Sequence, residues 1–179
     1  MRENKGYSLI ELIVVIAIMV VLTGMLVWGF SSVTNQEAKK AISLIDGYLN
    51  QTQTTAMTKT QGYCMISMDA EGNYFASLQD GTSKKLGDSK LVIDYQLEGT
   101  TGWKSITKSQ PLILSYEKSS GAFLPVITQV ESDRYVYLTT KGGDNSDISA
   151  YAASIRIQKG NYEKQIQLYP KTGKHQVES

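Results

Sequence analysis

The sequence has little of the chemistry that catalytic and covalent sites require. Among its 179 residues there is one cysteine and one histidine. A single cysteine excludes an intramolecular disulfide, and the alternating apolar stretch around Cys64 predicts a buried thiol rather than a reactive one. His175 lies four residues from the end of the chain, where we expect a solvated tail that could not hold a Ser-His-Asp or Cys-His site. We therefore expect a protein that is not an enzyme.

Metal and phosphate motifs are scarce as well. There is no Gly-rich phosphate loop and no His/Cys spacing of a zinc site. Residues 142–147, GGDNSD, form an acidic loop whose oxygens could ligate calcium. Their spacing departs from the EF-hand pattern, and three polar side chains in a loop are typical of a solvated turn. The sequence therefore predicts no metal and no cofactor.

Excess charge of either sign is also lacking. The chain has 18 Lys and Arg against 17 Asp and Glu, for a net charge of +1. A nucleic-acid footprint normally needs a clustered excess of basic residues. Two small basic clusters are expected in solvated loops: Lys84, Lys85 and Lys90, then Lys171, Lys174 and His175.

What the chain does have is a long apolar run close to its start. The run extends from Tyr7 to Phe30, 24 residues without proline, and follows a short charged N-terminal segment that ends in Gly6. As a helix it is long enough to cross a hydrocarbon core of about 30 Å. Its one charge is Glu11. The basic residues Arg2 and Lys5 precede it, which predicts a cytoplasmic N-terminus.

Two ordinary interpretations account for this run incompletely. A secretory signal peptide has an apolar core of about 7–15 residues and a small-residue cleavage site, and this run is longer and lacks that site. An uncleaved signal anchor leaves Glu11 unexplained, because a carboxylate at the bilayer centre costs roughly 2.5–3.5 kcal/mol. If the chain were cut after Gly6, the new amine of Tyr7 would lie about one helical turn from Glu11. That amine could meet the Glu11 carboxylate of a neighbouring copy.

Residues 5–11, KGYSLIE, followed by LIVVIAIMVVL, resemble the N-terminal processing and assembly motif of type IV pilins and pseudopilins. The resemblance implies that a membrane aspartyl peptidase, the prepilin peptidase, cleaves after Gly6 on the cytoplasmic side. It also implies that Tyr7 becomes the N-methylated first residue and that Glu11 acts in filament assembly. The family usually starts its mature chain with Phe. Many members also have a helix-kinking proline where this sequence has Gly24 and Gly29.

The resemblance also implies partners and a location. The partners are the prepilin peptidase, other pilin or pseudopilin subunits through the N-terminal helix, the inner-membrane assembly platform, and membrane lipid before assembly. Before assembly the chain would cross the membrane once, with its C-terminal part outside the cell. After assembly it would belong to a cell-surface filament. We expect four segments, which are a cytoplasmic leader (1–6), a transmembrane and filament-core helix (7–30), an amphipathic continuation (31–60) and an extracytoplasmic β-rich head (61–179).

Periodicity supports this division. Apolar residues recur at helical spacing after residue 30 and predict a helix that packs on the head and ends before Gly62: Val33, Ala38, Ala41, Ile42, Ile45, Leu49, Thr52, Ala56 and Met57. Period-two patterns then predict strands at 63–68, 74–78, 91–97, 111–116, 122–127, 134–138, 153–158 and 163–169. The fold class is therefore α+β, a long helix packed on an antiparallel β-rich head.

The last third resembles the heads of minor pseudopilins in the order of its strands and in its Thr172-Gly173-Lys174 ending, which favours a minor subunit. The sequence does not separate a pilus from a type II secretion or DNA-uptake filament. The alternative from another class is a membrane-anchored, non-polymerising β-rich domain that binds carbohydrate or DNA. An anchored hydrolase is disfavoured by the scarcity of catalytic groups.

Overall fold

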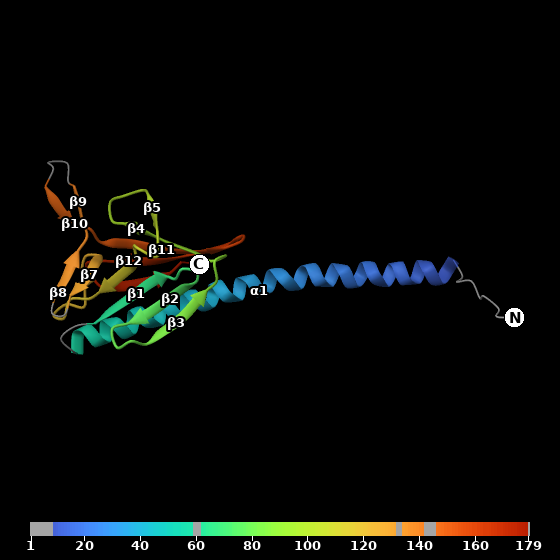
Figure 1. The fold of residues 1–179 in the computed structure, drawn as a ribbon, viewed down its shortest axis with the longest axis horizontal. Helices are drawn as coiled ribbons and strands as arrows, with labels where there is room; N and C mark the ends of the chain where they lie inside the picture. The colour runs from blue at the N-terminus through green and yellow to red at the C-terminus, as the bar shows by residue number, and fades with distance from the viewer. Residues whose placement is uncertain (1–8, 59–61, 132–133, 142–145, 179) are drawn as a thin grey trace. The chain divides into compact units, whose positions relative to one another are not determined.

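The computed structural model describes residues 9–58, 62–131, 134–141 and 146–178. The chain divides into two compact units, residues 1–36 and residues 37–179. The described residues form one helix, α1 (Leu9–Thr58), followed by thirteen strands (Figure 1). The predicted end of the helix before Gly62 is confirmed, and so is the α+β class. Residues 37–58 of α1 belong to the second unit, together with every strand.

The strands form two main sheets and one short pair, and all neighbouring strands are antiparallel. In sheet order the first sheet contains β3 (Ser83–Gly87), β2 (Tyr74–Leu78), β1 (Tyr63–Met68), β6 (Leu112–Ser115), β7 (Ile127–Glu131) and β8 (Arg134–Tyr137). The second contains β13 (Lys174–Val177), β12 (Tyr162–Tyr169), β11 (Ala152–Lys159), β4 (Val92–Leu97) and β5 (Trp103–Ser105). The short pair is β9 (Thr139–Lys141) with β10 (Asp147–Ser149).

A single hydrophobic core joins the helix to both sheets. The predicted helical stripe is confirmed from Ala38 to Ala56, since its residues in this range are all buried. Met57 is the exception: its side chain is exposed, although it lies in the last turn of α1, beside Gly121. Val33 lies outside the side chains that the structure describes. Alternate residues of the strands complete the core, including Ile66 of β1 and Ile155 of β11.

The predicted strands are mostly confirmed, with one error and several omissions. The two predicted hairpins form, β1 with β2 and β11 with β12. The strand expected over 122–127 is wrong: Phe123 makes an isolated bridge to Tyr116, and β7 begins only at Ile127. Pro125 lacks the N–H that a strand interior needs. Five strands were not anticipated, because β3, β5, β9, β10 and β13 are short and mostly exposed.

Near its C-terminal end, the helix is held by two glycine turns. The side-chain amide of Gln53 donates to the carbonyl oxygens of Gly121 (2.9 Å) and Gly173 (3.4 Å). Both glycines have positive φ, +68° and +67°. The two turns touch so closely that a Cβ on Gly173 would lie 1.7 Å from the carbonyl oxygen of Gly121. Glycine is therefore required at position 173 by backbone conformation and by space.

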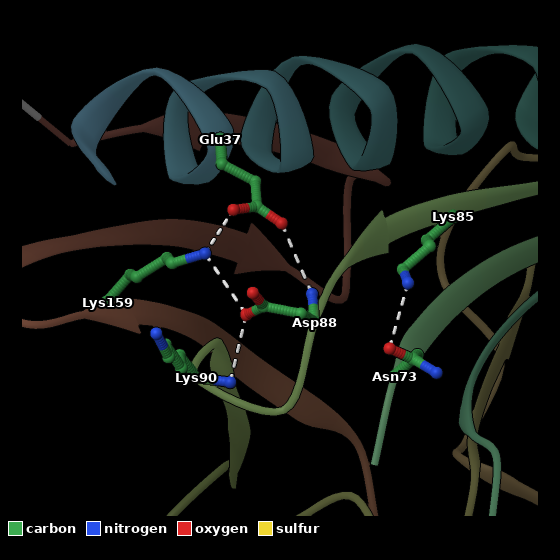
Figure 2. Close-up of polar contacts among 6 residues, drawn as sticks. All are labelled: Glu37, Asn73, Lys85, Asp88, Lys90 and Lys159. Carbon is green, nitrogen blue, oxygen red and sulfur yellow. Dashed lines mark hydrogen bonds and ion pairs between the residues drawn. The ribbon is translucent and has the colours of Figure 1, made fainter. Parts of the chain in front are cut away.

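Near residue 37, the helix is held by an ion cluster (Figure 2). The ammonium of Lys159, at the end of β11, pairs with the carboxylate of Glu37 and with Oδ1 of Asp88 at 3.1 Å. The second carboxylate oxygen of Glu37 accepts a hydrogen bond from the backbone N–H of Asp88 at 3.2 Å. The Lys159 side chain is only 5% exposed. A buried ammonium needs such partners because an uncompensated charge is costly away from water.

The cluster shifts the protonation of its members in the stabilising direction. The hydrogen bond from Lys159 is the main reason that the pKa of Asp88 lies below its ordinary value of 3.8. Burial alone would lower the pKa of Lys159, but its hydrogen bonds to Glu37 and Asp88 outweigh burial and raise the pKa above 10.5. Both groups are therefore charged over the whole physiological range.

We predict that Gly173→Ala lowers the free energy of unfolding by at least about 2 kcal/mol, because it combines a strained backbone with a clash that a neighbouring carbonyl cannot relieve. The matched control is Gly160→Ala, where φ is also positive (+58°) but no atom lies within 4 Å of the added Cβ. This control should lose only about 1 kcal/mol. Urea unfolding followed by circular dichroism checks both values, and equal losses would contradict the close approach.

We predict that Asp88→Asn destabilises the protein by about 1 kcal/mol or less near neutral pH, because Asp88 is partly solvated. Since the folded-state pKa of Asp88 is lowered, its contribution is present above about pH 4 and disappears as the pH falls through that pKa. The difference between wild type and variant should therefore shrink as the pH falls below about 4 and vanish once the folded-state carboxyl is protonated. Urea unfolding over a pH series measures it, with Glu71→Gln as an exposed control. A difference that persists in acid would show that the charge of Asp88 is not what stabilises the cluster.

Candidate functional site

The predicted processing site lies partly outside the described residues. Gly6 and Tyr7 precede the described part of the chain, which begins at Leu9. Glu11 is described and lies in the first turn of α1, on the helix surface. A carboxylate in this position interacts favourably with the partial positive charge at a helix N-terminus.

The surface around Glu11 is apolar. From Leu9 to Leu22 the large aliphatic side chains are all 50–80% exposed. They occupy consecutive positions and therefore every side of the helix, unlike the one-sided stripe from Ala38 to Ala56. A shallow groove is lined by Ile10, Glu11, Val14 and Val15, so the carboxylate borders an aliphatic depression. No helix in the described part of the chain is long and apolar enough to cross a membrane.

The structure places His175 differently from the sequence prediction. It was expected on a solvated tail, but it lies in β13, which pairs with the end of β12 and sets His175 opposite Leu168. This register turns the imidazole toward the helix, where Nε2 lies 3.2 Å from Oδ1 of Asp46 and the side chain is only 5% exposed. The prediction of a solvated His175 is therefore wrong. The histidine joins the last strand to α1.

Other groups that were candidates for chemistry are engaged in the fold. Burial raises the pKa of the Cys64 thiol to about 12, so this buried cysteine is neutral and the predicted burial is confirmed. Lys84 and Lys85 belong to β3 rather than to a loop, and Lys85 donates to Oδ1 of Asn73 at 2.8 Å (Figure 2). In the basic cluster at the end of the chain, Lys174 likewise lies in β13.

The acidic loop is described only in part. Residues 142–145 lie outside the described residues. Asp147 opens β10 and forms an ion pair with Lys141 of β9 at 2.8 Å. Across the residues that the structure describes, no three His, Cys, Asp or Glu side chains lie close enough together to hold a metal ion.

A polar cluster on the second sheet was not anticipated. Asp94 of β4 is 4% exposed; it accepts a hydrogen bond from Ser105 at 2.8 Å and pairs with the guanidinium of Arg156 at 2.5 Å. The same guanidinium lies over the ring of Trp103, 4.5 Å from its centroid. These residues come from three strands that are adjacent in the sheet, of which β4 and β5 are consecutive in the chain and β11 is distant. The alternation of Asp94 with apolar neighbours was the signal available in the sequence, and it does not name the partners.

Comparison with known proteins identifies the N-terminal segment. Residues 1–27 match the prokaryotic N-terminal methylation motif, a stretch that includes Gly6, Tyr7 and Glu11. No curated protein and no solved structure matches the chain. The match ends well before the head, so what it shows concerns the first helix. This chain carries the prepilin processing motif of type IV pilins and pseudopilins at residues 1–27.

Proposed function

We propose that this chain is a structural subunit, a pilin or pseudopilin of minor type, in a type IV pilus or a related type II secretion or DNA-uptake filament. The observation that carries the proposal is the match of residues 1–27 to the methylation motif. In this proposal the prepilin peptidase removes residues 1–6. Gly6 is then the cleavage-site residue, Tyr7 the N-methylated first residue and Glu11 the assembly carboxylate.

The exposed apolar surface of α1 supports assembly through the helix. Burying one large aliphatic side chain is worth about 1.5–3 kcal/mol, and all twelve large aliphatic side chains from Leu9 to Leu22 are exposed. Because these side chains surround the helix, contact on one side would leave the others in water. Several neighbouring helices, or lipid, can cover every side. We therefore propose that lipid surrounds the helix before assembly and that other subunits surround it afterwards. The assembly platform of the inner membrane acts at the transfer between these two states.

Glu11 has a specific role in this scheme. Covering the helix with apolar neighbours removes water from the carboxylate, and a desolvated charge needs a counter-charge. The α-amine that cleavage creates on Tyr7 supplies it from an adjacent subunit. The pairing requires one subunit to be displaced along the filament relative to the next, so the pair would set the axial register as well as cancel the charge.

The remaining parts of the proposal concern location and chemistry. The charged N-terminal segment before the apolar run supports a cytoplasmic N-terminus and an extracytoplasmic β-rich unit. We also propose that the chain has no catalytic activity, in keeping with the engagement of its cysteine and histidine in the fold. The meeting of the Gly121 and Gly173 turns at Gln53 supports the minor type, because it is built from the segments that resemble minor pseudopilins.

We predict that Glu11→Ala is cleaved normally but enters filaments at least about tenfold less than wild type, since leaving one buried charge unpaired costs about 3–5 kcal/mol. Glu11→Gln should fail in the same way, because it keeps the shape and loses the charge. Glu98→Ala, which removes an exposed acid from the head, is the matched control. Immunoblots of sheared filaments and of whole membranes measure incorporation and cleavage separately. Incorporation of Glu11→Ala at the wild-type level would overturn the proposed role of Glu11, whereas absence of the wild-type chain from filaments would favour a tethered, non-polymerising binding domain.

A further inference from the structure

The second sheet presents two straight rows of polar side chains on the face opposite its core. The first row crosses all five strands and consists of Trp103, Gln96, Ser154, Gln167 and Gln176, which the strand register places side by side. The second row consists of Ser105, Asp94, Arg156 and Gln165. We call these two rows the amide face. Between the two rows, Tyr95, Ile155 and Ile166 on the three inner strands are buried in the core.

Most outward-facing positions of the amide face carry uncharged amides or hydroxyls. A sheet face that is merely solvated would accept charged residues at these positions equally well. Gln96 on β4 and Gln165 and Gln167 on β12 are half-buried, and Ser154 on β11 between these strands is buried. Several of these side chains are already oriented: Ser154 donates to Oε1 of Gln167 at 2.8 Å, and Gln96 donates to the carbonyl oxygen of Thr100 at 2.7 Å. Each amide carries both donors and acceptors, and fixed groups lose less freedom when a ligand binds.

The charges of the amide face cancel internally. Asp94 and Arg156 pair at 2.5 Å, in the middle of the second row, so neither offers an unbalanced charge to a ligand. At the borders the face has two exposed acids, Glu163 on β12 and Glu178, whose backbone N–H donates to the carbonyl oxygen of Gln165 just after β13, and one exposed base, Lys174 on β13. A polyanion such as nucleic acid would find no excess positive charge here. The complementary ligand is uncharged and rich in groups that both donate and accept hydrogen bonds.

An aromatic ring completes the chemistry. Trp103 stands at one end of the first row, half-buried, and the guanidinium of Arg156 over its ring fixes its position. Arg156 occupies one face of the indole, so the opposite face is the one that can stack on the C–H face of a sugar, while the adjoining amides offer partners to the sugar hydroxyls. The row spans four strand spacings, about 19 Å, which is the shape of an extended chain rather than of a single small molecule.

We propose that the amide face binds a linear, neutral polysaccharide along the row from Trp103 to Gln176. The ligand's C–H faces stack on Trp103 and its hydroxyls exchange hydrogen bonds with Gln96, Gln167 and Gln176. This binding does not depend on polymerisation of the subunit. In a filament it would give the subunit an adhesive surface.

The test is affinity electrophoresis of the full-length chain in detergent, through gels containing amylose, hydroxyethyl cellulose or alginate. Retardation by at least one of the two neutral polymers, none by the anionic alginate, and no weakening when the salt concentration is raised are the expected results. Trp103→Ala and the double variant Gln96→Ala/Gln167→Ala should each weaken retardation by about tenfold or more. Gln129→Ala, on exposed β7 of the other sheet, should not change it.

Trp103→Phe protects the test against misfolding, since it keeps an aromatic ring and should retain part of the binding that Trp103→Ala loses. Absence of retardation by both neutral polymers would overturn the proposal, and so would equal retardation of wild type and Trp103→Ala. Filament incorporation of the same variants is the separate readout. Variants that enter filaments normally but no longer bind polymer would show that the amide face binds polysaccharide independently of filament assembly.

Discussion

The first half of α1 has an apolar surface on every side, and this surface determines what the helix can contact. The aliphatic side chains from Leu9 to Leu22 are exposed in the single chain, and water is an unfavourable environment for all of them. One packed domain could cover one side of such a helix, as the β-rich unit does for the stripe from Ala38 to Ala56. Covering all sides requires lipid or several copies of the same helix. The carboxylate of Glu11 then needs a positive charge from within that apolar environment.

The second half of α1 differs from the first half, because its apolar side chains lie on one side and pack on one domain. Its apolar stripe packs into the core, and polar contacts hold it near three points along its length: Glu37 with Lys159, Asp46 with His175, and Gln53 with the glycine turns. Each contact reaches a segment distant in sequence. A helix segment with these contacts is part of the head. The same helix can therefore belong to the β-rich unit at one end and to its neighbours at the other.

The sequence was sufficient for the features that depend on local pattern. Helical periodicity located the buried stripe, alternation located both hairpins, and the motif around Gly6 and Glu11 located the segment that the family comparison matches. It was insufficient where long-range pairing decides. His175 looked like part of a polar tail because its burial depends on β13 pairing with β12. Arg156, the ionic partner of Asp94, and Glu37 and Asp88, the partners of Lys159, lie far away in the chain, and no spacing in the sequence indicates these pairs.

Assembly through Glu11 depends on prepilin processing of the chain, and the identity of the first residue of the mature protein tests that processing. Mass spectrometry of the N-terminal peptide, from protein recovered from membranes of cells with an active prepilin peptidase, gives that identity. Prepilin processing predicts a chain that starts at Tyr7 and carries a methyl group on its amine. A chain that still starts at Met1 under these conditions would contradict it, because the amine proposed to pair with Glu11 would then not exist.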